Sequence, residues 1–292
     1  MQAGTIDITR IPDGDTAKLA HVIARLQPRY PDRLHAVALP GAWWEWLNTQ
    51  VPPFDNQLAR QAVNYAIDRE KVIKDVFGPG VLRPSCQILP ANFPSFEEYC
   101  PYTRAGPNPY NGPDLAKARR LVKQSGTNGT PVTVYGIIGG ASDRALLADF
   151  AQALRDIGYR VSTRTVPDND ASYASLSDPR HGVQIWGKDG WIPDYPSADT
   201  FYDPLVSCRV KNMRAAGFCN RHIDDLATVA RVTALTDPNK SRRLWKEIDR
   251  LVTDQAPCVT LGSELFFHFT GSRVGNYQST PFNPLYDQLW VK

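Results

Sequence analysis

One short stretch of the sequence combines aromatic rings with carboxylates in a way that could bind a cation. Residues 187–202 are GKDGWIPDYPSADTFY, and they place Trp191, Asp194, Tyr195 and Asp199 within nine positions. A carboxylate accepts a charge-assisted hydrogen bond from an amine, and an indole ring covers an apolar body beside it. We therefore expect Asp194 to hold the charged end of a guest molecule, with Trp191 and Tyr195 lining the wall beside it. The alternative is structural, with Trp191 as a core anchor and Asp194 as a turn former or helix cap.

The elements around this stretch predict where it lies. Gly190, Pro193 and Pro196 interrupt regular structure, so we expect a loop over residues 187–202. The apolar run Val183–Trp186 before it predicts a short strand. In open α/β sheets, ligands dock beyond the carboxyl ends of strands, and loops on a rigid scaffold carry binding groups. The sequence thus predicts a binding loop at the edge of a sheet.

The middle of the chain predicts the sheet itself. A strand over Val132–Ile138, a helix over Ser142–Ile157 and a strand over Tyr159–Val166 follow one another with short connections. This is a β-α-β pattern, whose strands should be parallel. We therefore expect an α/β fold. The other elements predicted are helices over Asp15–Leu26, 55–77 (as two), Asp114–Gln124 and Ala171–Leu176, two helices after Cys219, and strands over His35–Leu39, Val259–Leu261, Leu265–Phe269 and Leu285–Val291, with a turn at Pro40-Gly41.

Three tryptophans stand within four residues of one another, at Trp43, Trp44 and Trp46. In a strand, side chains alternate between the two faces, so Trp44 and Trp46 would share one face and Trp43 would point to the other. The functional interpretation is that Trp44 and Trp46, together with Trp186, line the wall of a ligand cleft. The alternative is ordinary burial on both faces.

The five cysteines favour disulfides over metal ligation. Cys86 and Cys100 bracket a proline-rich segment, Cys208 and Cys219 bracket a polar one, and no CxxC motif occurs. Each bridge would close the short loop between its two cysteines, and would stabilise the fold by about 3 kcal/mol in the chain-entropy model. Cys258 lies in an apolar run and is expected to be a buried thiol. The alternative is five reduced thiols in a cytosolic protein.

Composition excludes several classes of function. The chain has 292 residues, 42% of them hydrophobic and 22% charged, and a net charge of +3, with no basic run of the kind that binds nucleic acid. No stretch approaches the roughly 18 apolar residues that span a bilayer. The five histidines are scattered, and neither a GxSxG nor a GxGxxG motif is present. We therefore expect no metal site, no cofactor and no assembled catalytic set.

Several segments, in order, resemble one protein family. The run Trp46-Leu47-Asn48-Thr49, the following Pro52-Pro53-Phe54 and the sequence RQAVNYAIDR over residues 60–69 are similar to family 5 extracellular solute-binding proteins. These are the peptide- and nickel-binding components of ABC importers. Residues 87–102, the segment GWIPDYP and the Cys208…Cys219 pair also resemble the family, so the similarity spans about residues 40–260.

The resemblance implies a receptor that closes two lobes around a solute and hands it to a membrane permease. In peptide binders of this family, the acidic residue three positions after the loop tryptophan binds the peptide's α-amino group, and that position is Asp194 here. Such a bond would contribute about 1.5–3 kcal/mol. The resemblance also implies a monomer without catalysis, located outside the cytoplasm, periplasmic or lipid-anchored. Residues 1–5 lack the features of a secretory signal, so we expect the signal to be absent from this sequence.

Two alternatives remain for the function. The same receptor fold could select an oligosaccharide, a nickel complex or another small solute. A different class would be a secreted hydrolase that uses Asp194 and Asp199 as paired carboxylates. Since relatives of the family are much longer, we expect residues 41–264 to form one lobe, and 1–40 with 265–292 to be pieces of the other lobe and the hinge.

Overall fold

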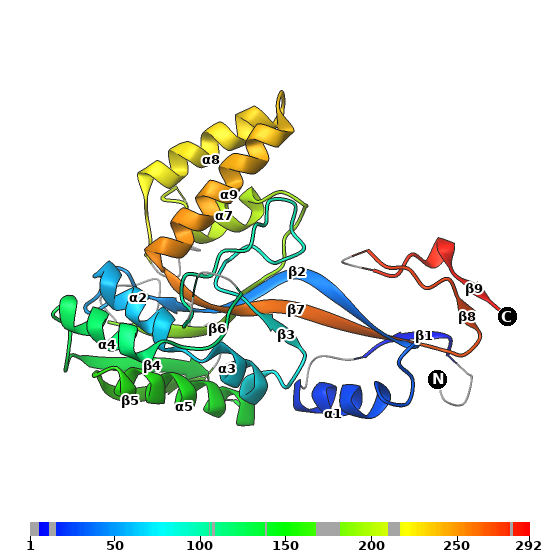
Figure 1. The fold of residues 1–292 in the computed structure, drawn as a ribbon, viewed down its shortest axis with the longest axis horizontal. Coiled ribbons are helices and arrows are strands. Elements are labelled where there is room, and N and C mark those ends of the chain that lie inside the picture. Colours follow the sequence, from blue (N-terminus) through cyan, green and yellow to red (C-terminus); the bar gives the residue numbers. More distant parts are fainter. Residues whose placement is uncertain are drawn as a thin grey trace.

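One mixed sheet runs through the molecule and organises the helices on its two faces (Figure 1). The computed structural model describes residues 6–11, 16–104, 106, 109–137, 139–167, 182–209, 217–280 and 283–292. The helix expected around Ala171–Leu176 lies outside these ranges. The strands are ordered β1-β7-β2-β6-β4-β5, and β3 pairs with β7. The α/β class expected from the sequence is confirmed.

The sheet is parallel on one side and antiparallel on the other. Its strands are β1 (Ile8–Arg10), β2 (Leu34–Leu47), β3 (Leu82–Pro84), β4 (Pro131–Ile137), β5 (Arg160–Val166), β6 (Ile185–Trp191) and β7 (Cys258–Thr270). β4 lies between β5 and β6 and is parallel to both, as the β-α-β pattern predicts for β4 and β5. β2 is antiparallel to both of its neighbours, β6 and β7.

β2 and β7 are much longer than the sequence predicts. They have 14 and 13 residues, whereas the local signals predict a turn at Pro40-Gly41 and two separate strands after Pro257. The register of β2 against β7 shifts between Ala38 and Ala42, and this irregularity accommodates a proline that cannot donate a ladder hydrogen bond. Pairing on both sides of β2 therefore outweighs the turn signal.

The two long strands connect a helix-rich body to a thin arm (Figure 1). The arm contains β1, α1 (Thr16–Leu26), and a two-stranded ribbon of β8 (Val274–Gly275) and β9 (Trp290–Val291), with the short 3-10 helix η2 (Tyr286–Gln288) before β9. These are the residues that the sequence assigns to a second lobe. The division into residues 41–264 and the remainder stays a prediction.

Four helices cover one face of the sheet. They are α2 (Gln57–Ala66), α3 (Arg69–Val76), α4 (Leu115–Gln124) and α5 (Ala141–Asp156). The first three begin where the sequence places a capping side chain, because Asn56, Asp68 and Asp114 each accept a hydrogen bond from a backbone N–H in the first turn. Their apolar stripes join the larger of two core clusters, which contains Phe54, Val63, Val134, Phe150 and Leu261.

Of the helices in the described ranges, three lie over the opposite face. They are α7 (Asp199–Val206), α8 (Arg221–Ala234) and α9 (Pro238–Gln255), the last capped by the Asp237 side chain. α7 is not predicted from the sequence, since it is short and contains Pro204. The second core cluster lies here, and its large members include Trp44, Trp46, Phe201, Tyr202 and Trp245.

Candidate functional site

The strand that leads to the candidate binding residues is longer than expected. The sequence predicts a loop from Gly187 onward, but β6 continues to Trp191 and is a central strand between β2 and β4. The prediction is wrong because both glycines have a place in the sheet. A Cβ atom added at Gly187 would overlap the carboxyl group of Glu45, and one at Gly190 would lie 2.9 Å from the Trp43 ring. Glycine here makes room for a large neighbour rather than ending the strand.

The chain leaves the sheet directly after Trp191. Asp194 and Tyr195 follow on an irregular segment, and both side chains are exposed. The backbone N–H of Asp194 donates to the Thr200 hydroxyl at 3.2 Å, which ties the segment to α7. Among the described residues, no ion pair involves the Asp194 carboxylate. It is therefore an accessible negative charge at the rim of the sheet.

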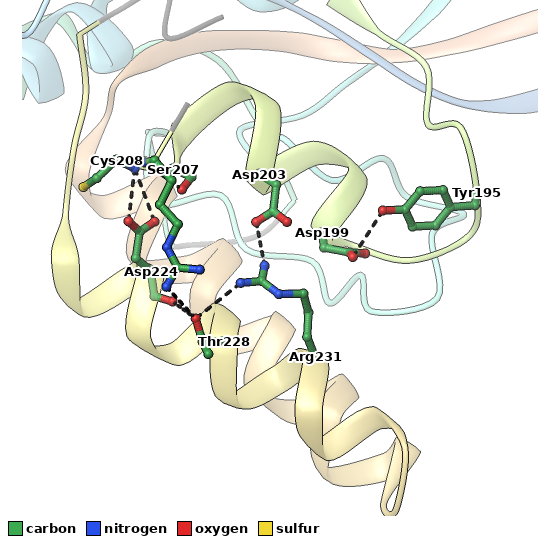
Figure 2. Close-up of polar contacts among 9 residues, drawn as sticks. Tyr195, Asp199, Asp203, Ser207, Cys208, Asp224, Thr228 and Arg231 are labelled. Carbon is green, nitrogen blue, oxygen red and sulfur yellow. Dashed lines mark hydrogen bonds and ion pairs between the residues drawn. The ribbon is translucent and has the colours of Figure 1, made fainter. Parts of the chain in front are cut away.

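The first turns of α7 continue this acidic rim (Figure 2). The Tyr195 hydroxyl donates to Oδ2 of Asp199 at 3.2 Å, and burial together with that carboxylate raises the pKa of Tyr195. One turn later, Asp203 forms an ion pair of 2.6 Å with Arg231 of α8. Asp203 is thus neutralised by α8, whereas Asp199 has one oxygen bonded to Tyr195 and the other, Oδ1, buried without a hydrogen-bond partner.

The remaining tryptophans of the prediction lie beneath this rim. Trp44, Trp46 and Trp186 are 0%, 1% and 3% exposed, and all three belong to the second core cluster. The alternation is confirmed, since Trp43 joins the first cluster on the other face. Their burial contradicts the prediction that Trp44, Trp46 and Trp186 contact a solute. The three side chains form an aromatic floor that α7–α9 cover. Trp191 packs against this floor but is only partly buried.

Both predicted disulfides are present. Cys86 is bonded to Cys100 and Cys208 to Cys219, while Cys258 is a buried free thiol. The second bridge is anchored further, because the Cys208 N–H donates to both carboxylate oxygens of Asp224 at 3.3 and 3.1 Å (Figure 2). This fixes the end of α7, on which Asp199 and Asp203 lie, to the start of α8.

One acid near the site is not singled out by the sequence analysis. Glu45 lies on β2 among the tryptophans and is 1% exposed. Its carboxyl group accepts a hydrogen bond from the backbone N–H of Lys188 on β6. Burial raises its pKa to about 8. The signal was available, since a single acid inside the apolar run from Trp43 to Leu47 has to be buried with its neighbours.

Within the described ranges, no group of three or more His, Cys, Asp or Glu side chains is arranged to hold a metal ion. A search of the same ranges finds no helix with the length and apolarity needed to cross a membrane.

Comparison with known proteins identifies the family. The sequence model described as bacterial extracellular solute-binding proteins, family 5 Middle, matches residues 1–213. The chain belongs to this family. The resemblance noted from the RQAVNYAIDR segment and the GWIPDYP segment is therefore confirmed.

Two curated relatives illustrate the range of solutes within family 5. The glutathione-binding protein GsiB of Salmonella typhimurium is 27% identical over 237 residues, covering 78% of this chain and 44% of that protein. Heme-binding protein A of Haemophilus influenzae is 28% identical over 301 residues, covering 99% of this chain and 50% of its own length. The chain thus spans about half the length of the curated family 5 relatives that it matches.

A solved structure shows that one known fold extends over the whole chain. HbpA2 from Haemophilus parasuis superposes with a TM-score of 0.84 at 17% identity, covering 100% of this chain and 55% of that structure. The arm and the body therefore both have counterparts in one larger molecule, and the periplasmic-binding-protein fold expected from the sequence is confirmed.

Proposed function

We propose that this chain carries part of the solute-capturing surface of a receptor for an ABC importer, and that Asp194 binds the α-amino group of a peptide. The observation that carries the proposal is the state of Asp194, which is exposed, at the rim where β6 ends, and without an ion-pair partner among the described residues. An ammonium group on a solute would complete this site with a charge-assisted hydrogen bond.

The charge of the rim favours a cationic end over an anionic one. Asp194 and Asp199 lie on either side of Tyr195, and the described residues pair neither with a lysine or arginine. Solutes that present carboxylates to this rim would meet repulsion. Peptides, including small ones such as glutathione, carry an α-ammonium group, whereas the propionates of heme are negative. This favours a peptide over heme or a neutral oligosaccharide.

The arrangement of the two acids does not support hydrolysis. A catalytic pair needs both carboxyl groups free to face a substrate. Asp199 has one oxygen occupied by Tyr195 and the other buried. We therefore propose binding without catalysis and assign Asp199 to the support of Tyr195.

The proposed role also implies a membrane partner and a location for the receptor. A solute receptor of an importer delivers its ligand to a membrane permease and works outside the cytoplasm. Two disulfides, which persist in oxidising compartments, support this location. We propose that the receptor is monomeric and that residues beyond this chain supply the facing wall, because a solute is desolvated only when both sides of a cleft enclose it.

A thermal-shift panel on the full-length protein tests the proposal. Dipeptides, tripeptides, glutathione, heme, cello-oligosaccharides and Ni²⁺ are compared, and we expect stabilisation by peptides. A ligand at 100 times its Kd stabilises by about 2.7 kcal/mol, which is readily measured. Asp194→Ala should abolish the shift, while Asp225→Ala, which removes an exposed acid from α8, should keep it.

Two outcomes would contradict the proposal. A shift with oligosaccharides or heme and none with peptides would overturn the peptide assignment. Turnover of any candidate solute would overturn the assignment of a receptor.

A further inference from the structure

Glu45 and Gly187 form a matched pair at the centre of the β2–β6 pairing. Glu45 is opposite Gly187 in the register, and its carboxyl group occupies the space that any side chain at residue 187 would need. The same carboxyl group accepts the backbone N–H of Lys188. A buried acid is thus bonded to the backbone of the strand that leads to Asp194.

That bond holds an extra residue in β6. Trp44 is opposite Asp189 and Glu45 is opposite Gly187, so Lys188 has no partner on β2 and forms a bulge. Its φ of 60° lies in the left-handed region that non-glycine residues seldom adopt. The conformation is held from both ends of the residue.

The side-chain end of Lys188 is anchored to α5. Its Nζ atom lies 2.9 Å from Oδ1 of Asp143 and 3.3 Å from the hydroxyl of Ser142, both in the first turn of that helix. The backbone end is held by Glu45. Two separate elements, β2 and α5, therefore keep the bulge in place.

The bulge decides which face Trp191 occupies. Residues five apart in a regular strand point to opposite faces, yet Trp186 and Trp191 both pack against the second core cluster. The extra residue restores the alternation, so that Trp191 lies opposite Ala42, another member of that cluster. Without the bulge, Trp191 would turn toward the other face, and Asp194 would leave the sheet in a different direction.

We propose that Glu45 is the positioning residue of the solute site: its carboxyl group holds the Lys188 bulge, and the bulge directs Trp191 and Asp194 to the rim. This inference rests on the proposed function of Asp194 but concerns a residue that does not itself reach the solute.

The surroundings of Glu45 make this positioning dependent on pH. The charged groups near Glu45 are Lys188 and Asp189 on β6, and Asp143 of α5, which is paired with Lys188. On the neighbouring strand β7, the titratable group is the Cys258 thiol, whose pKa burial raises to about 12. Burial is the main cause that raises the pKa of Glu45 from 4.5 to about 8; the hydrogen bond from the Lys188 N–H and the charge of Lys188 lower it, and the charge of Asp189 adds a smaller rise.

The direction of the pH effect follows from these shifts. The folded state binds the Glu45 proton more tightly than the unfolded chain does, so the stabilisation is complete below pH 4.5 and is lost as the pH rises to about 8. An ionised Glu45 then carries the cost of burial and the repulsion of Asp189, which together exceed the gain from its hydrogen bond with the Lys188 N–H. We expect the bulge, and with it the rim, to loosen over this range.

The test compares Glu45→Gln with the wild type and with Glu247→Gln, the same chemical change at an exposed position of α9. Glutamine keeps an acceptor oxygen for the Lys188 N–H but cannot ionise. Both measurements are made between about pH 6 and about pH 9. Calorimetry gives the peptide affinity. The fluorescence of Trp191 is obtained by subtracting the emission spectrum of a Trp191→Phe protein.

The proposal predicts that wild type and Glu247→Gln lose about tenfold more peptide affinity across this range than Glu45→Gln, in which only the deprotonation of the peptide's α-amino group, with a pKa of about 8, weakens binding. The Trp191 emission should change over the same range in the wild type and not in Glu45→Gln. A Glu45→Gln profile identical to that of the wild type would overturn the proposal.

The two proposals fail in distinguishable ways. If the wild type binds no peptide, the proposed function fails, but the Trp191 emission still reports on the bulge. If peptide binds and neither affinity nor emission depends on Glu45, the positioning role fails alone. Should Glu45→Ala fold poorly, Glu45→Gln remains the deciding variant because it conserves shape.

Discussion

The two ends of β6 use the same types of residue for different purposes. Near its start, Trp186 lies opposite Trp46, and both are buried in the second core cluster. At its end, Trp191 lies opposite Ala42 and is only partly buried, and the exposed Asp194 follows three residues later. Aromatic residues thus form the floor at one end and the rim at the other.

The acids differ in the same way. Asp189 accepts a hydrogen bond of 2.8 Å from the indole N–H of Trp46, so its carboxylate is used within the fold. Within the described part of the chain, the backbone N–H of Asp194 donates to Thr200, and the Asp194 carboxylate forms no ion pair. An aromatic residue beside an acid therefore indicates a binding site only where the strand leaves its neighbours. Substitutions in the floor and at the rim should therefore have effects of different size.

The largest difference is expected between two tryptophans. Trp46→Ala should cost about 3–5 kcal/mol of unfolding free energy, because it opens a cavity in the core and removes the indole N–H that donates to Asp189. Trp191→Ala should cost about 1–2 kcal/mol, since less of the ring is buried. Urea unfolding followed by circular dichroism measures both values. Equal losses would mean that the rim is part of the core.

The disulfide over the floor should have the next largest effect. Ile88, Leu89 and Phe93, which cover the second cluster, lie in the loop closed by Cys86 and Cys100, 14 residues apart. The double variant Cys86→Ser/Cys100→Ser should lose about 3 kcal/mol of unfolding free energy through the greater freedom of the unfolded chain. Denaturant midpoints with and without a reductant check this. A wild type insensitive to the reductant, with the bridge shown by mass spectrometry to be broken, would contradict it.

A buried hydrogen bond in the floor gives a smaller, pH-dependent effect. Tyr202 donates to Oδ1 of the buried Asp249 at 2.6 Å, and burial raises the pKa of that acid to about 6 although Tyr202 and Gln87 both favour the charged form. Tyr202→Phe should cost about 1–3 kcal/mol at neutral pH, and less below about pH 6, where Asp249 is protonated. Unfolding curves at several pH values measure the difference. A loss independent of pH would show that Asp249 does not change its protonation state over this range.

The smallest effect is expected at the rim itself. Tyr195→Phe removes the exposed hydrogen bond to Asp199 and should change the unfolding free energy by less than about 0.5 kcal/mol. Thermal unfolding without ligand measures this value. A loss as large as that of Tyr202→Phe would show that the rim is held as firmly as the floor.

Much of the fold could be predicted from local patterns. The helices with capping residues at Asn56, Asp68 and Asp114 and the parallel pair β4–β5 agree with the periodicity, because amphipathic stripes and caps act within a few residues. The extent of β2 and of β6 could not be predicted. Gly187 and Gly190 look like loop residues until Glu45 and Trp43 are seen to fill the space beside them.

The candidate site could be predicted only in part. The sequence places Trp191, Asp194 and Tyr195 together, and the structure places these three at the rim. The sequence alone cannot show that α7–α9 cover Trp44, Trp46 and Trp186, because this burial depends on contacts between segments that are distant in the chain. The role of Glu45 depends on register, which a single extra residue in β6 changes.

The most direct test of the central claim is a calorimetric cycle on the full-length protein, with one peptide and its N-acetylated form, and with the wild type and Asp194→Asn. If Asp194 holds the α-ammonium group, acetylation should weaken binding to the wild type by about 10- to 150-fold, equivalent to about 1.5–3 kcal/mol. Asp194→Asn should bind both forms with the same low affinity. Equal sensitivity to acetylation in the two proteins would show that the amine is bound elsewhere, and would contradict the account.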